Sequence, residues 1–387
     1  MIKRLKIRNF KSIRELDLEL DPVTVLVGRS GTGKSNIVQA LRFLRNCLLD
    51  LNQAVTFEGG WARIFPVGSD KPSVLVEVAF SIPDELEEYS YAVTFGAFAP
   101  EAAQISRETL SLGSSVLYSR FRQQNGQWKW DRAPLVEPQP ALSDGPILGN
   151  VPSLQETVFA YAALSLGIGC YQFPSSVFLS VVQPPPFLLN QQGLQDTAGN
   201  YRDIMRRMTQ DFHHPEVRKG LLASLQEINP SLKSVELDSL TNPQAVVAGH
   251  KIGDRVLALS LEQESDGFRR FYAHLLALYQ TPAKLTLIFE EPENAIFPGA
   301  LSLLAEEFKA APREKRGQVI LTTHSPSLLD SFDVDSVRVV DMKDGATVVG
   351  RVSREQREAV KDKLLKTGEL LTVETPRLDE PAALEPA

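Results

Sequence analysis

A glycine-rich stretch near the N-terminus constrains the fold of this chain more than any other feature. Residues 28–35 read GRSGTGKS and fit the pattern G-x-x-x-x-G-K-[ST], whose backbone N–H groups cradle phosphates. The apolar run 23–27 before it predicts a buried strand, and apolar residues at helical spacing after it predict a helix to about Leu49. A glycine-rich turn that only caps a helix is the alternative, and the strand before it disfavours that reading. The stretch predicts binding of a nucleoside triphosphate.

Each residue type in this loop has a chemical task. Glycines let the backbone turn tightly enough to aim several N–H groups at one phosphate, and the helix that opens at Lys34 adds the positive end of its dipole. Lys34 would neutralise the β- and γ-phosphates of the nucleotide, and Ser35 would hold Mg²⁺. The residues expected to bind the nucleotide here are Gly28, Arg29, Ser30, Gly31, Thr32, Gly33, Lys34, Ser35 and Asn36.

Composition narrows the class of protein. The chain has 387 residues, of which 43% are hydrophobic and 23% charged, as in soluble globular proteins with a large core. No apolar run is long enough to span a membrane, the N-terminus lacks a signal-peptide pattern, and two cysteines give no disulfide framework. We therefore expect a cytoplasmic protein without membrane contacts.

The net charge of −7 means that any nucleic-acid contact would need a local basic patch. One candidate is a stripe of basic residues near the N-terminus. The alternative is that these residues only form the solvated face of a strand. Its members are Lys3, Arg4, Lys6, Arg8, Lys11 and Arg14.

The patterning predicts an α/β fold in four sections. Residues 1–133 would form the N-terminal part of a nucleotide-binding lobe with a β arm that ends in a hairpin at Asn125-Gly126. Residues 134–244 would form a helical insert that begins with a Pro/Gly-rich linker. Residues 245–370 return to strands and helices and would complete the lobe, and residues 371–387 would be a disordered tail.

A second apolar run, Leu285–Phe289, ends in consecutive carboxylates. Acids at the end of a buried strand lie at the carboxyl edge of the sheet, where open α/β folds bind ligands. Because side chains alternate along a strand, adjacent acids diverge and can serve separate roles. We assign Glu290 to the Mg²⁺ shell and Glu291 to the attacking water as general base. A solvated acidic turn is the alternative.

Two further stretches belong with this edge. His324 follows the apolar strand 318–323, so it could contact the γ-phosphate or the water, although a lone histidine there can also be structural. Ser265, Asp266 and Gly267 precede a helical pattern and could form a second anion-binding helix start, for which a plain N-cap is the alternative.

These motifs, in this order, resemble the ABC-type ATPase heads of the SMC, RecF and OLD group, most closely a compact bacterial branch without a coiled coil. The resemblance covers the chain to about residue 370. It implies a P-loop NTPase with a mixed central sheet, an antiparallel β subdomain and a helical lobe. In that family residues 28–35 correspond to Walker A, Glu290-Glu291 to Walker B with the catalytic glutamate, and His324 to the switch histidine.

The resemblance also implies partners and further contacts. Ser265, Asp266 and Gly267 correspond to the signature motif, which acts on the nucleotide of a second subunit, so two copies would hold ATP between them. Asn9, Lys11 and Ser12 would lie near the nucleotide. The signature departs from the pattern at Glu264 and Asp266, which suggests slow turnover with ATP as a switch, and the Q-loop glutamine has no assignable position.

Spacing separates branches of the group. Lys34 and Ser265 are 231 residues apart (265 − 34), more than we expect for a transporter subunit. Only 63 residues follow His324 (387 − 324), too few for the TOPRIM nuclease domain of OLD proteins. We expect an ATPase in which Glu291, His324 and Lys34 catalyse ATP hydrolysis. It would act with duplex DNA or an effector in DNA repair or anti-phage defence. A nucleotide-switched scaffold for a separately encoded nuclease is the alternative, and a transporter subunit is disfavoured.

Overall fold

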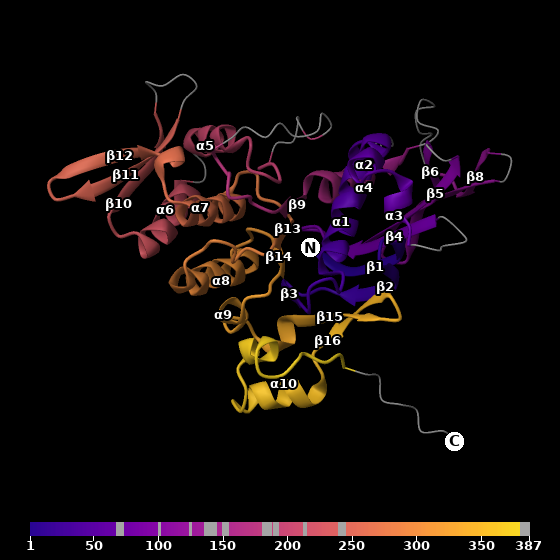
Figure 1. Cartoon of the computed structure of the whole chain (residues 1–387). Helices are drawn as coiled ribbons and strands as arrows, with labels where there is room; N and C mark the ends of the chain where they lie inside the picture. Colours follow the sequence, from indigo (N-terminus) through magenta and orange to yellow (C-terminus); the bar gives the residue numbers. More distant parts are fainter. Residues whose placement is uncertain are drawn as a thin grey trace.

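The computed structural model describes residues 1–66, 73–99, 102–123, 126–134, 145–148, 155–179, 188, 193–211, 215–238 and 245–379. Within these residues the strands form three sheets: a central, largely parallel sheet, an antiparallel sheet and a small sheet. Figure 1 shows the antiparallel sheet and the small sheet at opposite ends of the molecule, with the central sheet between them.

The central sheet has the strand order β16-β15-β3-β14-β13-β9. Its strands are β3 (Val23–Val27), β9 (Ile168–Tyr171), β13 (Thr286–Glu290), β14 (Gln318–Thr322), β15 (Val337–Lys343) and β16 (Ala346–Arg351). All neighbours are parallel except β15 and β16, which form a hairpin. β13 and β14 are buried along their whole length, because a parallel sheet is covered on both faces.

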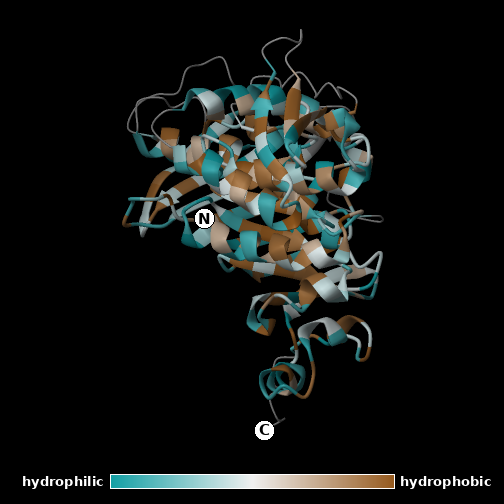
Figure 2. Cartoon of the chain, turned by 90° about the vertical axis from the view of Figure 1, so that its left-hand side faces the viewer, coloured by the Kyte–Doolittle hydropathy of each residue, from teal (hydrophilic) through white to brown (hydrophobic). Residues whose placement is uncertain are grey.

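Alternating side chains of the central sheet enter two different cores. Val25 and Phe289 pack in one core with helices of the C-terminal half, whereas Leu26 and Ile288 pack in the other with the first helix and the antiparallel sheet. Hydrophobic residues accordingly gather on the central strands in Figure 2. This two-sided burial fixes the register of β3, β13 and β14, whose carboxyl ends carry the expected site.

The antiparallel sheet has the order β2-β1-β4-β5-β6-β7-β8. Its strands are β1 (Ile2–Phe10), β2 (Ile13–Glu19), β4 (Ser73–Phe80), β5 (Tyr89–Ala99), β6 (Ala102–Leu112), β7 (Ser115–Arg122) and β8 (Trp128–Arg132). The small sheet consists of β10 (Leu232–Leu237), β11 (Val246–Ile252) and β12 (Arg255–Ser260). In β4 every second residue is buried, as expected for a sheet with one covered face.

The helices flank the central sheet on both faces (Figure 1). On the side of the antiparallel sheet lie α1 (Lys34–Leu49), α2 (Leu51–Phe57), α3 (Trp61–Ile64) and α4 (Gln155–Tyr161). The other helices are α5 (Tyr201–Gln210), α6 (Pro215–Ile228), α7 (Asp266–Tyr279), α8 (Pro298–Arg313), α9 (Pro326–Leu329) and α10 (Arg354–Lys361). No helix in the described parts of the chain has the length and hydropathy needed to cross a bilayer.

The fold class predicted from the sequence is confirmed. Three strands occupy residues 1–28, a helix follows the glycine-rich loop, and β7 and β8 pair as a hairpin, although Asn125 of its turn lies outside the described residues. The expected linker at 134–153 falls mostly outside them as well. The expected helical insert differs from the structure at β9, which joins the central sheet beside β13.

The expected disordered tail is wrong for residues 371–379. Leu378 forms a β-bridge with Val352, and the Asp379 backbone N–H donates to the Arg351 carbonyl at 2.9 Å. The Arg357 side chain also pairs with the Asp379 carboxylate at 2.5 Å. This segment therefore packs on β16 and α10, and residues 380–387 lie outside the described part of the chain.

Candidate active site

The loop from Gly28 to Ser35 connects β3 to α1 and turns so tightly that two of its glycines cannot be replaced without collision. A Cβ added at Gly28 would meet the Val340 carbonyl oxygen, and one at Gly33 would meet the Thr347 hydroxyl. Gly33 has φ 99° and precedes α1 without a side-chain cap, which leaves the first helical N–H groups available to an anion. The loop therefore has the geometry of a phosphate cradle.

Lys34 lies across this loop. Its ammonium donates to the carbonyls of Gly28 and Arg29, both at 2.9 Å, and the residue is 5% exposed. Burial lowers the pKa of Lys34, and the charges of Glu291 and Glu293 oppose that shift. Those two carboxylates thus act electrostatically on the loop lysine although they are more than 250 residues away in the chain.

Glu290 and Ser35, the two residues expected at Mg²⁺, come together. Burial raises the pKa of Glu290, and the charge of Arg42, the neighbouring Ser35 side chain and the charge of Lys11 oppose that effect. Arg42 has no motif around it that would predict this place: it lies on α1 seven residues, or about two turns, after Ser35.

Glu291 leaves the line of β13. Its φ of 47° turns the backbone, and its N–H donates to the Thr322 carbonyl (3.1 Å) and hydroxyl (3.2 Å) at the end of β14. The Glu291 Oε1 lies 3.7 Å from the His324 Nε2, and both side chains are partly exposed. The structure therefore brings the two residues expected to hold the water side by side at the open edge of the sheet.

Two further residues support this pair, and the sequence reasoning assigned neither a role. Glu293 accepts from the Thr323 hydroxyl (2.8 Å), the His324 N–H (2.8 Å) and the Ser325 N–H (3.1 Å), all on its Oε1. Asn294 donates from its Nδ2 to the Glu291 Oε2 at 3.0 Å. Glu293 is the third acidic residue within residues 290–293, and this run of acids is the sequence signal that could have pointed to it.

The turn between β1 and β2 contacts the loop through Ser12. The Asn36 amide donates to the Ser12 Oγ at 2.6 Å, and the Ser12 Oγ also lies 2.6 Å from the Thr347 hydroxyl. Lys11 is oriented differently, because its ammonium contacts the Glu58 carboxylate at 2.5 Å and Gln39 at 2.7 Å. Its charge nevertheless favours the ionised form of Glu290 and so lowers the pKa of that carboxyl.

The start of α7 forms a separate surface. Ser265 is the N-cap and accepts from the Phe268 N–H at 3.2 Å, while Asp266 pairs with Arg269 at 3.6 Å and Arg270 at 3.5 Å. Ser265 and Gly267 line a cavity of about 400 Å³ between the end of α6 and the start of α8, which also contains Phe297. None of these contacts is with residues 28–35.

Glu264, one of the two positions at which the signature departs from the family pattern, is held in place beside this helix start. Its Oε1 lies 2.6 Å from the His250 Nε2, and both side chains are 8% exposed. The His250 ring also packs edge-on to Phe268, with ring centroids 6.3 Å apart. The Glu264–His250 contact therefore links β11 to the start of α7.

The residues present fit Mg²⁺ only together with a phosphate ligand. The described residues contain no cluster of three or more His, Cys, Asp or Glu side chains that could hold a metal alone. Ser35 and Glu290 supply a hydroxyl and a carboxylate side by side, the oxygen ligands that Mg²⁺ takes when substrate phosphates and waters complete its shell.

Two parts of the chain match known protein families. Residues 1–128 match the family model "AAA ATPase domain", and residues 188–330 match "AAA domain, putative AbiEii toxin, Type IV TA system". The OLD nuclease of Thermus scotoductus is 44% identical over 41 residues, which are 11% of this chain and 8% of that protein. The chain thus matches a small part of the length of that relative.

Solved structures share the fold. The Smc head bound to the C-winged helix domain of ScpA is 16% identical, covers 92% of this chain and 99% of its own, and superposes with a TM-score of 0.55. The Smc head with an extended coiled coil bound to the C-terminal domain of ScpA from Pyrococcus furiosus is 13% identical, covers 94% and 99%, and gives 0.53. The two ATPase-domain models and this fold support an ATPase with the fold of an SMC head.

Proposed function

We propose that this ATPase works as a homodimer that closes on ATP, with each nucleotide held by residues 28–35 of one copy and by Ser265 and Gly267 of the other. One observation supports the hydrolytic half of the site most strongly. Glu291 and His324 lie 3.7 Å apart at the end of the strands beside the loop that holds Lys34. The separate surface at the start of α7 supports the second half.

The proposed roles follow from chemistry and position. Lys34 and the loop N–H groups bind the phosphates, and Ser35 and Glu290 hold Mg²⁺, which when bound neutralises the phosphate charge that develops during transfer. Glu291 accepts the proton of the attacking water, and His324 orients that water or contacts the γ-phosphate. Asn294 fixes the direction of the Glu291 carboxylate.

The basic stripe gives little support to DNA as the partner. Arg4 pairs with Asp17 at 2.6 Å, Arg8 with Glu15 at 2.7 Å and Lys6 with Glu77 at 3.0 Å, so cross-strand carboxylates neutralise much of the stripe. Counterion release requires unpaired positive charge. We therefore place a protein effector before duplex DNA as the partner, in DNA repair or anti-phage defence in the cytoplasm.

ATP turnover of the Glu291→Gln variant tests the chemistry. We expect a fall in turnover of about 100-fold or more, because a general base contributes that much. ATP affinity should stay near wild type, and ATP-loaded dimers should accumulate in sedimentation. Lys34→Ala should lose ATP binding, and Glu306→Gln, an exposed acid on α8, is the matched control. Wild-type turnover by Glu291→Gln would show that the base is assigned wrongly.

A nucleotide-switched scaffold for a separately encoded nuclease is the second candidate. The Glu264–His250 contact favours it, since this pair replaces the usual signature residue and fixes the helix start in one position. Turnover of the wild type, measured with and without duplex DNA, tests the scaffold. Stimulated turnover in the isolated protein contradicts the scaffold, and unchanged, very slow turnover supports it.

A further inference from the structure

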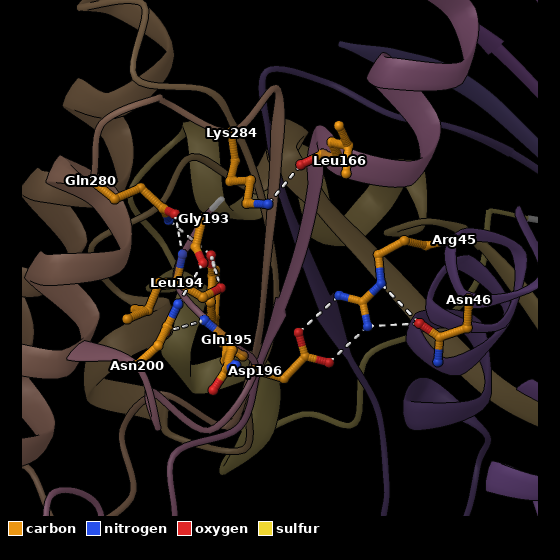
Figure 3. A network of polar contacts seen from close by, with 11 residues as sticks. Arg45, Asn46, Leu166, Gly193, Leu194, Gln195, Asp196, Asn200, Gln280 and Lys284 are labelled. Atoms are coloured by element: carbon orange, nitrogen blue, oxygen red, sulfur yellow. Dashed lines mark hydrogen bonds and ion pairs between the residues drawn. The ribbon is translucent and has the colours of Figure 1, made fainter. Parts of the chain in front are cut away.

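A buried ion pair connects α1, which begins at Lys34, to a segment before α5. Arg45 lies on α1 eleven residues after Lys34 (45 − 34), and its side chain is fully buried. It donates to both carboxylate oxygens of Asp196 at 2.8 Å and to the Asn46 Oδ1 at 2.9 and 3.0 Å (Figure 3). Because a buried guanidinium without a partner is strongly unfavourable, this pair holds the two elements together.

The same segment is attached on its other side to the end of α7. The Leu194 N–H donates to the Oε1 of Gln280, the C-cap residue of α7, at 2.7 Å. The Gln280 Nε2 donates in turn to the Ala277 carbonyl (2.7 Å) and to the Tyr171 hydroxyl (2.8 Å) of β9. A single residue, Gln195, thus separates the bond to α7 at Leu194 from the bond to α1 at Asp196.

Internal bonds make this segment rigid. The Asn200 side chain donates to the Gly193 carbonyl at 3.0 Å and accepts from the Gln195 N–H at 2.9 Å. Gly193 passes so close to Lys284 that an added Cβ would meet the Lys284 side chain. Lys284 is itself fixed by donating to the Leu166 carbonyl at 2.6 Å (Figure 3).

We propose that Arg45 and Asp196 are a positioning pair that transmits the position of the nucleotide-binding helix α1 to α7. The 14 residues of α7 form one rigid rod between Gln280 and Ser265. A shift of α1 when ATP binds would therefore move the signature surface at the other end of α7. This inference rests on the proposed function, since it concerns how the two halves of that site are coupled.

The variant Asp196→Asn tests the coupling, with Asp21→Asn as the matched control. Asp21 also pairs with a buried arginine, Arg338, at 2.5 Å, but it precedes β3 at the end away from the loop. Full-length proteins are compared by hydrogen–deuterium exchange with and without the β,γ-imido analogue of ATP. The affinity for the analogue, kcat and thermal unfolding are measured in parallel.

In the wild type and in Asp21→Asn we expect the analogue to slow exchange at residues 265–272. In Asp196→Asn we expect similar analogue affinity, with the protection of residues 265–272 and kcat each reduced about tenfold, a usual size for coupling between sites. If Asp196→Asn does not fold, Arg45→Lys, which keeps the charge but loses the paired donors, should show the same loss in part.

The outcomes separate this inference from its premise. Wild-type protection and kcat in a folded Asp196→Asn or Arg45→Lys variant would overturn the positioning role. An equal loss in Asp21→Asn would show a general loss of stability and would also overturn it. A wild type that binds neither ATP nor the analogue would instead overturn the proposed function.

Discussion

A single carboxylate, Glu293, holds the turn that presents His324. Its Oε1 accepts three hydrogen bonds from residues 323–325, two of them from backbone N–H groups. Bonds of this kind to an ionised acceptor are stronger than neutral ones. The position of His324 relative to Glu291 therefore depends on a residue that itself follows the catalytic strand by three positions.

Replacing Glu293 should separate positioning from binding. For Glu293→Gln we expect kcat to fall about tenfold or more and the free energy of unfolding to fall by about 1–3 kcal/mol, because the charged acceptor is lost. ATP affinity should change little, since the hydrogen bonds of Glu293 are with residues 323–325 and not with residues 28–35. Turnover assays and urea unfolding measure both, with Glu314→Gln, an exposed acid after α8, as the control.

The opposite result would be informative. If Glu293→Gln loses stability but keeps wild-type kcat, the turn at His324 does not need this carboxylate for catalysis. If it loses ATP affinity instead, Glu293 acts on the nucleotide through Lys34, whose pKa it already influences.

The helix α7 links three parts of the molecule. It begins at the signature residue Ser265, ends at Gln280 beside Asp196, and buries His274 in its middle against Phe173 and Phe289. The His274 Nδ1 donates to the Arg270 carbonyl at 2.6 Å, and burial lowers the pKa of His274 to about 4. This histidine is therefore neutral in the folded protein above that pH.

Acid should destabilise the protein through His274. The unfolded chain takes up the proton near pH 6.5, whereas the folded chain takes it up only near pH 4, so stability falls as pH drops between these values. The His274 contribution amounts to about 3 kcal/mol at pH 4. His274→Phe keeps a ring in the core and should lack this part of the pH dependence. Unfolding curves from pH 7 to 4 that fall equally in both proteins would contradict the prediction.

Local patterns predicted the elements that carry the chemistry, and long-range contacts were not predictable. The loop 28–35, the acids after β13 and His324 each follow an apolar strand, so their positions at one sheet edge could be inferred. β9 is only four residues long and lies in a stretch whose patterning predicts a helix, so the sequence does not indicate this strand. The Arg45–Asp196 pair joins residues 151 positions apart, and neither has a motif around it.

The whole chain presents two surfaces on different parts of the fold. The loop 28–35, Glu291 and His324 lie at the edge of the central sheet, whereas Ser265 and Gly267 line a cavity between α6 and α8. Arg270 of α7 donates to the Asn294 carbonyl, so the two surfaces meet at the turn after Glu291, but no described hydrogen bond or ion pair joins Ser265 or Gly267 to residues 28–35. Under the proposed function, a site built from both surfaces takes each surface from a different copy. Two-fold symmetry would place two such sites in one dimer.

Mixing two inactive variants tests this central claim directly. Lys34→Ala disables the loop of a copy, and Ser265→Arg blocks its signature surface. If sites form between copies, each variant alone is inactive, and a mixed dimer contains one intact site made of the wild-type loop of one copy and the wild-type Ser265 of the other. We predict that mixing restores ATP turnover to a fraction of wild type. Two folded variants that bind each other but stay inactive when mixed would contradict the composite site.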